Sequence, residues 1–137
     1  MKLPKKIIDA NVVLRFFLAD DTRKYAKACA FMENLEFGKD EALLTEIVFA
    51  EVVWVLNKVY KVSRPDIAGQ FAQVVGFLGM KTVLDKALFI ESLELYGEMK
   101  MDIQDIMLAV IAKRTGSSLV TFDKKDFRKL GCEYSEP

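Results

Sequence analysis

Apolar residues along this chain fall into runs whose lengths and spacings predict short strands alternating with helices. Strands are expected over residues 6–8, 41–44, 80–84 and 118–122, with a possible edge strand at 132–134. Helices are expected over residues 12–18, 22–36, 46–60, 64–78, 85–98, 102–115 and 124–130. Strands that are separated by helices throughout imply an α/β fold with a parallel sheet and right-handed crossovers.

The expected helix 46–60 is the most apolar stretch of the chain. Between Ile47 and Leu56 its only charged residue is Glu51. A helix that is apolar on all sides is usually buried, so Glu51 is predicted to be a carboxylate inside the core. An unpaired charge there would be strongly unfavourable. Glu51 is therefore either a functional acid or half of a buried ion pair with an arginine or lysine.

Two further acids stand directly after expected strands. Asp9 follows Ile7 and Ile8, and Asp123 follows the strand at 118–122. Ligands of open parallel sheets bind beyond the carboxyl ends of the strands, which makes both acids candidates for a functional site. The structural alternative is that Asp9, or Asn11, caps the next helix and that Asp123 caps the turn at 124–130.

Asp102 and Asp105 lie three residues apart in the first turn of the expected helix 102–115. Asp102 as the N-cap and Asp105 as a residue stabilised by the helix dipole form the structural alternative. However, Ala109 and Ala112 share the face of Asp105, and such small residues allow close approach to the sheet. Asp105 is therefore the better functional candidate, and Asp102 is expected to act mainly as the cap.

The composition narrows the chemistry that these acids can support. The 137 residues suit a single domain, and 20 basic against 20 acidic residues leave no net charge to attract nucleic acid globally. The chain has no histidine, which excludes serine or cysteine triads, imidazole bases and histidine-containing zinc sites. Its two cysteines are too few for an all-thiolate zinc site. Four carboxylates gathered in one crevice would instead require a hard cation such as Mg²⁺ or Mn²⁺.

The same composition predicts the compartment. Cys29 and Cys132 are far apart in sequence, and the simplest interpretation is a reducing environment. The basic start of the chain is not followed by a long apolar stretch, so no signal peptide is expected. No apolar run reaches the length of about 18 residues that a membrane span needs. These observations favour a cytoplasmic protein with no membrane partner.

Four blocks of sequence carry a resemblance to a known family. They are Asp9-Ala10-Asn11-Val12-Val13-Leu14-Arg15, Glu51-Val52-Val53-Trp54-Val55-Leu56, Asp102-Ile103-Gln104-Asp105-Ile106-Met107-Leu108-Ala109 and Val120-Thr121-Phe122-Asp123. In order and spacing they resemble the PIN-domain ribonucleases, specifically the VapC-type toxins of prokaryotic toxin–antitoxin pairs. The resemblance covers nearly the whole chain and implies that residues 1–137 are a single nuclease domain.

The resemblance also implies a site, a fold and partners. The family's four acids fall on Asp9, Glu51, Asp105 and Asp123, which would be the catalytic and metal-binding residues. Asn11, Thr121 and Asp102 match supporting positions. The implied fold has three α/β/α layers around a five-stranded parallel sheet. The implied activity is Mg²⁺- or Mn²⁺-dependent cleavage of RNA by a homodimer that a small cognate antitoxin blocks. Contacts with the RNA backbone could come from Arg15, Arg114, Lys124, Lys125 and Arg128.

Three other functions remain open from the residues. The first is a catalytically silent binding or regulatory module, although the presence of all four acids argues against it. The second is a phospho-acceptor receiver domain, which would need an acidic pair after the first strand and a lysine after the last. Here Asp9 is followed by Ala10 and Asn11, and residues 132–137 contain no lysine. The third is another metal-dependent phosphohydrolase.

Overall fold

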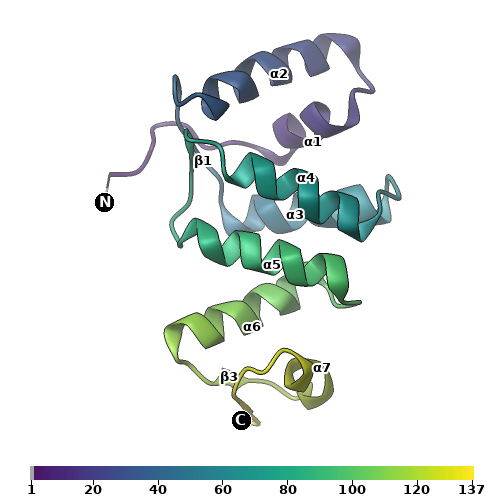
Figure 1. The fold of residues 1–137 in the computed structure, drawn as a ribbon, viewed down its shortest axis with the longest axis vertical. Coiled ribbons are helices and arrows are strands. Elements are labelled where there is room, and N and C mark those ends of the chain that lie inside the picture. Colours follow the sequence, from purple (N-terminus) through teal and green to yellow (C-terminus); the bar gives the residue numbers. More distant parts are fainter. Residues whose placement is uncertain (1) are drawn as a thin grey trace.

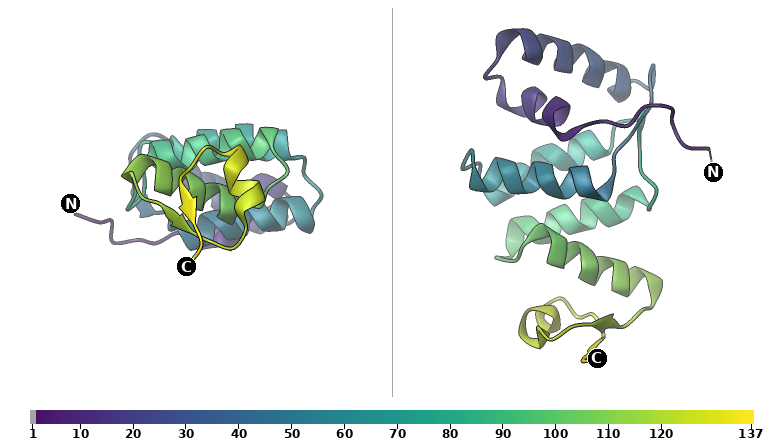
Figure 2. Two further views of the ribbon diagram at one scale, coloured as in Figure 1. Left: turned by 90° about the horizontal axis from the view of Figure 1, so that it is seen from below. Right: turned by 180° about the vertical axis from the view of Figure 1, so that it is seen from behind.

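The computed structural model describes residues 2–137, and its elements follow in the expected order. They are α1 (Ala10–Leu18), α2 (Thr22–Glu36), β1 (Ala42–Leu43), α3 (Glu46–Lys58), α4 (Arg64–Val75), β2 (Met80–Lys81), α5 (Lys86–Glu98), α6 (Ile103–Thr115), β3 (Leu119–Val120), α7 (Lys124–Lys129) and β4 (Tyr134–Ser135). The helices are stacked along the long axis, with α1 and α2 at one end and β3 and α7 at the other (Figure 1, Figure 2).

Local capping explains why most helices begin where the sequence predicts. The side chains of Asp21, Thr45 and Ser63 accept hydrogen bonds from backbone N–H groups in the first turns of α2, α3 and α4. Several boundaries differ from the prediction by two residues or more. Helix α1 begins at Ala10 rather than at Val12, α3 ends at Lys58 rather than near Tyr60, and α4 ends at Val75 rather than near Leu78.

The strands form two separate parallel groups. In the first, β1 pairs with β2, and Ile7 forms a parallel bridge with Leu43 on the other side of β1. In the second, β3 pairs with β4. All these pairings are parallel, as predicted, but within residues 2–137 they do not join into the expected five-stranded sheet with helices on both faces. The assigned strands are only two residues long, so few backbone hydrogen bonds hold each group.

The predicted strand at 118–122 is present as the two residues of β3, and apolar residues of this stretch are exposed. Val120 is 63% exposed and Phe122 is 80% exposed. The physical reason is that β3 is bonded on one side only, because the N–H groups of Leu119 and Thr121 donate to the carbonyls of Glu133 and Ser135. Its other edge faces no strand in the described part of the chain.

The core lies between the helices and is built around α3, α4 and α5. The Phe49 ring lies 5.0 Å from that of Phe71 and 4.9 Å from that of Phe89, centroid to centroid. All three rings are fully buried, and contacts of this kind add to the stability that burial itself provides. Among residues 2–137, no helix is both long and apolar enough to cross a membrane.

The prediction that α3 is buried on all sides, with Glu51 in the core, is wrong. Phe49, Val52, Val53 and Leu56 form its buried face, whereas Ile47 is 80% and Trp54 50% exposed. Glu51 lies between these two on the outer face and is itself exposed. The reason is that α1, α4 and α6 pack against α3 but leave one stripe open to solvent. A buried ion pair therefore does not explain Glu51.

Candidate functional site

Asp105 is the acid whose surroundings differ most from those of a surface carboxylate. It lies half-buried in the first turn of α6, on a helix whose Ala109 and Ala112 are buried as expected. Burial raises the pKa of Asp105, and the nearby charges of Asp102, Asp123 and Asp126 raise it further. The fold thus brings acids from the start of α6 and from the β3–α7 segment close enough to repel one another.

Asp102 occupies the N-cap position of α6, as predicted, but its side chain accepts no capping hydrogen bond. The backbone of Asp102 thus has the extended conformation of an N-cap residue, but its carboxylate does not cap the helix. The backbone N–H of Ile106 donates to the Asp102 carbonyl at 3.1 Å, which begins the helix without the side chain. The carboxylate of Asp102 is exposed and adds to the negative charge around Asp105.

Asp123 is a helix cap, as the structural alternative predicts, and its carboxylate is also one of those that act on Asp105. It is the N-cap of α7, where its Oδ1 accepts from the backbone N–H of Asp126 at 3.5 Å. Its own N–H donates to Oγ1 of Thr121 at 2.9 Å. Thr121, predicted as a supporting residue, thus fixes the turn that presents Asp123. The Asp123 cap is long and weak, so it leaves the carboxylate available for other contacts.

Asp9 stands at the start of α1 and Glu51 within α3. Asp9 is exposed at the N-cap position of α1 without a side-chain capping bond, and its neighbour Asn11 is also exposed. Neither Asp9 nor Glu51 is among the carboxylates that raise the pKa of Asp105. That all four acids converge on one crevice therefore stays a prediction. Such convergence would need the backbone around Ile7, which is bridged to β1, to meet β3, which pairs only with β4.

Sequence reasoning missed Asp126, which lies within electrostatic range of Asp105. A signal was present, because Asp123 and Asp126 repeat the three-residue spacing of Asp102 and Asp105 at the start of a helix. The segment containing them was interpreted only as a capped turn.

The donor set fits a hard divalent cation in chemistry but only partly in geometry. Carboxylate oxygens are the ligands that Mg²⁺ and Mn²⁺ prefer, and a cation would relieve the repulsion around Asp105. However, no three acidic or cysteine side chains within residues 2–137 lie close enough together to hold an ion. The charges act on Asp105 over a longer distance than metal ligation requires.

The basic residues predicted to contact RNA are largely engaged in surface contacts. Arg15 pairs with Asp20 at 2.6 Å, Arg114 with Glu91 at 2.8 Å and Lys124 with Glu136 at 3.0 Å. Arg128 donates to the hydroxyl of Tyr134 at 3.0 Å. Lys125 is exposed. Exposed pairs of this kind are weak, so a phosphate could replace the acidic partner.

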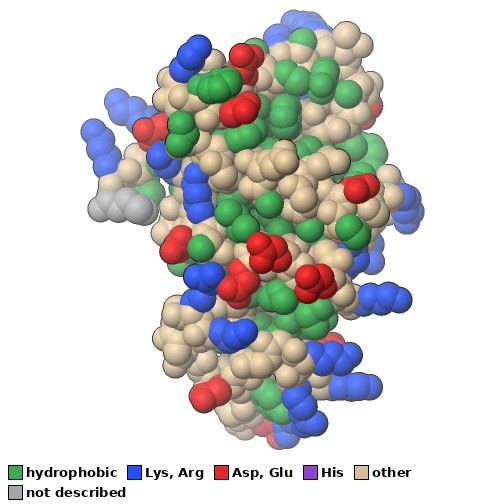
Figure 3. All heavy atoms as spheres, in the orientation of Figure 1, with side chains coloured by type: hydrophobic (Ala, Val, Ile, Leu, Met, Phe, Trp, Pro, Cys, Tyr) green, Lys and Arg blue, Asp and Glu red, His purple; other side chains and the backbone are tan. Residues whose placement is uncertain are grey.

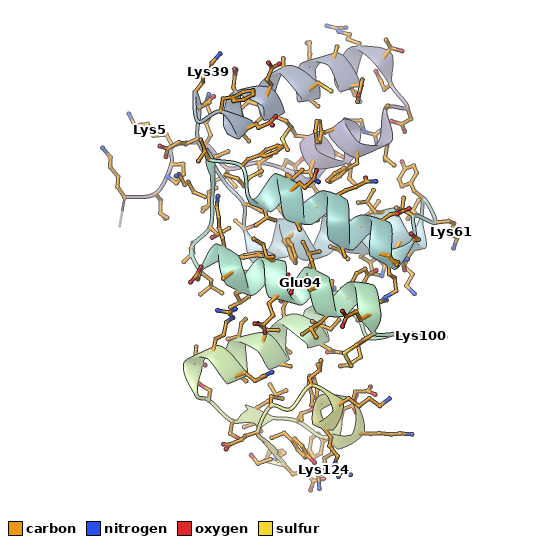
Figure 4. The ribbon with its side chains drawn as sticks, viewed as in Figure 1. Lys5, Lys39, Lys61, Glu94, Lys100 and Lys124 are labelled. Atoms are coloured by element: carbon orange, nitrogen blue, oxygen red, sulfur yellow. The ribbon has the colours of Figure 1, made fainter. Side chains whose placement is uncertain are left out.

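A different group of lysines lies near the start of α6. We call Lys58, Lys61 and Lys100 the basic rim. Lys58 ends α3, and all three are exposed. Lys61 and Lys100 project outward on the same side of the molecule (Figure 4). Along that edge Figure 3 shows several lysine or arginine side chains one after another. This local charge is not visible in the net charge of zero.

Comparisons with known proteins identify the family to which the chain is similar. A family model described as "PIN domain" matches residues 6–131, a span that includes all four predicted acids. A VapC ribonuclease of Aquifex aeolicus (strain VF5) is 27% identical over 140 residues, which cover 96% of each chain. The two findings confirm the resemblance and the α/β class drawn from the sequence.

Proposed function

Because the chain belongs to the PIN-domain family, we propose that it is a metal-dependent endoribonuclease that acts as the toxin of a toxin–antitoxin pair. The observation that carries this proposal is the acidic group around Asp105, which lies within the matched span. A catalytically silent module would have no need to hold carboxylates where they repel one another. The similarity to a VapC ribonuclease over nearly the full length supports RNA as the substrate.

Asp9, Glu51, Asp105 and Asp123 are the side chains that would hold the Mg²⁺ or Mn²⁺. When bound, such an ion activates a water for attack on the phosphodiester and stabilises the charge on the leaving oxygen. Asp105 would bind the cation as a carboxylate, and because its pKa is raised, acidification should begin to weaken cation binding at a higher pH than for an ordinary aspartate. Thr121 positions Asp123 through the bond to its N–H, and Asn11 lies two residues after Asp9.

A site made of all four acids requires the two strand groups to meet. Strand 6–8 uses the carbonyl of Lys6 and the N–H of Ile8 to bond Leu43, so the backbone of Ile7 points to the opposite edge. The backbone of Val120 points to the free edge of β3 for the same reason. Parallel pairing of these edges would complete the expected five-stranded sheet and place Asp9 and Asp123 at the same end. The exposure of Ile7, at 68%, and of Val120 supports this.

The partners that we propose are RNA, a cognate small antitoxin and a second copy of the chain in a homodimer, all in the cytoplasm. Exposed apolar side chains support contacts with proteins. Ile47 and Phe122 are each 80% exposed, and Phe122 directly precedes Asp123. A protein bound over Phe122 would cover the acid beside it, which is a direct way to block cleavage.

The proposal is tested by incubating the purified chain with RNA and either Mg²⁺ or Mn²⁺. We expect cleavage products that appear with either ion, disappear when excess EDTA is added and return when the ion is restored. The matched control is the Asp123→Asn variant, which retains an N-cap for α7 and should not cleave. Equal cleavage in excess chelator, or by both proteins, would refute a carboxylate–metal mechanism.

A further inference from the structure

The exposed face of α3 carries an aromatic side chain directly beside one of the predicted acids. Residues 47, 51, 54 and 58 follow one another at helical spacing and therefore share this face. Glu51 and Trp54 are one turn apart, and half of the indole surface is open to solvent. The fold thus leaves a large flat ring accessible next to a carboxylate that the proposed function uses.

The indole borders a pocket between the ends of several helices. The pocket is lined by Trp54, Asn57, Lys58, Arg64, Asp102 and Gln104, among others, and we call it the Trp54 pocket. One lining residue, Asp102, also belongs to the acidic group around Asp105. Another lining residue, Lys58, also belongs to the basic rim.

One wall of the Trp54 pocket is held firmly in place. The Arg64 guanidinium lies 3.6 Å from the centroid of the Tyr96 ring and donates through Nε to the Tyr96 carbonyl at 2.9 Å. It also donates to the carbonyl of Met101. Asn57, which also lines the pocket, donates through its amide nitrogen to the carbonyl of Val62 at 3.0 Å. These bonds fix the surroundings of the indole before any ligand arrives.

We propose that an unpaired nucleobase of single-stranded RNA stacks on the exposed indole of Trp54 at the mouth of the Trp54 pocket, with the adjoining phosphates on the basic rim. The pocket itself, at about 10 Å³, is too small to take the base. This proposal rests on the proposed ribonuclease function and names where the substrate strand lies. Stacking on an aromatic ring accepts any base, because every base has a flat π-face. Lysines beside the ring would contact the backbone without reading the sequence.

The surroundings of Trp54 favour a nucleic acid over a protein as the occupant. The centres of protein–protein interfaces are depleted of charged residues. The Trp54 pocket instead has Lys58, Arg64 and Asp102 in its lining, together with the amides of Asn57 and Gln104. A duplex would not present a free base face to the indole, so the preferred ligand is single-stranded.

Trp54 is the only tryptophan of the chain, so its fluorescence reports on this pocket alone. The experiment is a titration of the wild-type protein with a short single-stranded RNA in EDTA, which prevents cleavage. We expect saturable quenching of the tryptophan emission, little quenching by the same RNA as a duplex, and no change on diluting the protein alone. Binding detected by fluorescence anisotropy of labelled RNA without any quenching would overturn the proposal. A signal that follows protein dilution instead of RNA would assign the surface to self-association.

Variants separate stacking from general damage. Trp54→Ala should weaken binding of the single strand about 5- to 150-fold, which is the loss expected from removing one base stack. Trp54→Phe should recover most of the affinity. Phe37→Ala is the matched control, because it removes a similarly exposed aromatic ring, 59% exposed, just after α2 and outside the pocket lining, and it should bind like the wild type. Circular dichroism confirms that each variant is folded.

The outcome also distinguishes this proposal from the function on which it rests. If the wild type cleaves RNA but Trp54→Ala binds RNA normally, the Trp54 pocket is not the base site and the ribonuclease assignment stands. If no divalent ion supports cleavage but the quenching and its loss in Trp54→Ala are seen, the pocket stands and the ribonuclease assignment fails.

Discussion

Asp105 follows a structural rule for helix starts and is also the acid on which the proposed function depends most. An acid in the first turn of a helix is favoured by the helix dipole, usually by about 0.3–1 kcal/mol. Here the neighbouring carboxylates and partial burial act in the opposite direction and raise its pKa. The position therefore gains less from the dipole than an isolated acid would. Such a placement is understandable if a cation normally balances the charge.

Comparing Asp105→Asn with Asp102→Asn separates these roles. Asp105→Asn should abolish cleavage and weaken Mn²⁺ binding, because it removes a proposed ligand. Asp102→Asn keeps a good N-cap residue at a position whose side chain makes no capping bond, so the melting temperature should hardly change. It should also retain substantial activity. Cleavage rates and Mn²⁺ titrations on both variants decide the matter. Wild-type cleavage by Asp105→Asn would exclude it as a ligand, and equal losses in both would make Asp102 a ligand too.

The raised pKa of Asp105 predicts a pH-dependent effect on stability in the absence of metal. Above the unfolded value of 3.8, the folded protein still holds the Asp105 proton that the unfolded chain has lost. This contribution to stability therefore falls as pH rises through the folded pKa. Asparagine mimics the protonated form, so in EDTA at pH 7 Asp105→Asn should be more stable than the wild type by less than about 1 kcal/mol.

The check is urea unfolding of both proteins across a series of pH values. The difference in their unfolding free energies should shrink toward zero near about pH 3, where the carboxyl is protonated in both states. A difference that stays constant with pH, or a less stable Asp105→Asn at neutral pH, would contradict the assigned cause of the shift.

At the scale of single elements, the sequence predicted the helices far better than the strands. Several helices begin at a side chain that accepts a hydrogen bond from a backbone N–H two or three residues later. These N-caps include Asp21, Thr45, Ser63 and Asp85. Because each cap involves only neighbouring residues, it can be predicted from the sequence. The exposure of Glu51 could not be predicted from the sequence, because it depends on which neighbours cover α3. The same is true of the exposure of Val120, which depends on what packs beside β3. Local chemistry sets helix starts, whereas tertiary contacts set which face is covered.

The connection between α5 and α6 is held by Arg64, a contact that no sequence pattern predicted. From the first turn of α4 it bonds carbonyls at both ends of the loop that leads into α6. Arg64→Met should destabilise the protein by about 1–3 kcal/mol, because buried acceptors lose their donor. Since that loop leads directly to Asp102, the variant should also weaken Mn²⁺ binding.

Thermal melts and Mn²⁺ titrations test this prediction together. Arg64→Lys keeps the charge but not the planar fork and should recover only part of the stability. Lys100→Met is the matched control, because Lys100 is an exposed cation next to the same loop, and it should melt like the wild type. An Arg64→Met variant with unchanged melting temperature and unchanged Mn²⁺ affinity would show that the hydrogen bonds of Arg64 are not needed to keep the loop in place.

For the whole molecule, the acids fall into two sets. Asp102, Asp123 and Asp126 act on Asp105, whereas Asp9 and Glu51 stand on other elements, α1 and α3. The sequence could place acids after strands and at helix starts, because these are local relations. It could not determine how the strands join, because strands of two residues carry too little pattern to specify their neighbours. The family match covers both sets and makes one shared metal site the central proposal.

The most direct measurement is a calorimetric Mn²⁺ titration of the wild type and of Asp9→Asn, Glu51→Gln, Asp105→Asn and Asp123→Asn. Asp66→Asn is the control, because Asp66 is an exposed acid in the first turn of α4. If one site uses all four acids, each of the four substitutions should weaken Mn²⁺ binding by at least about tenfold, and the control should not. Wild-type affinity in both Asp9→Asn and Glu51→Gln would contradict a shared site and confine the metal to the acids around Asp105.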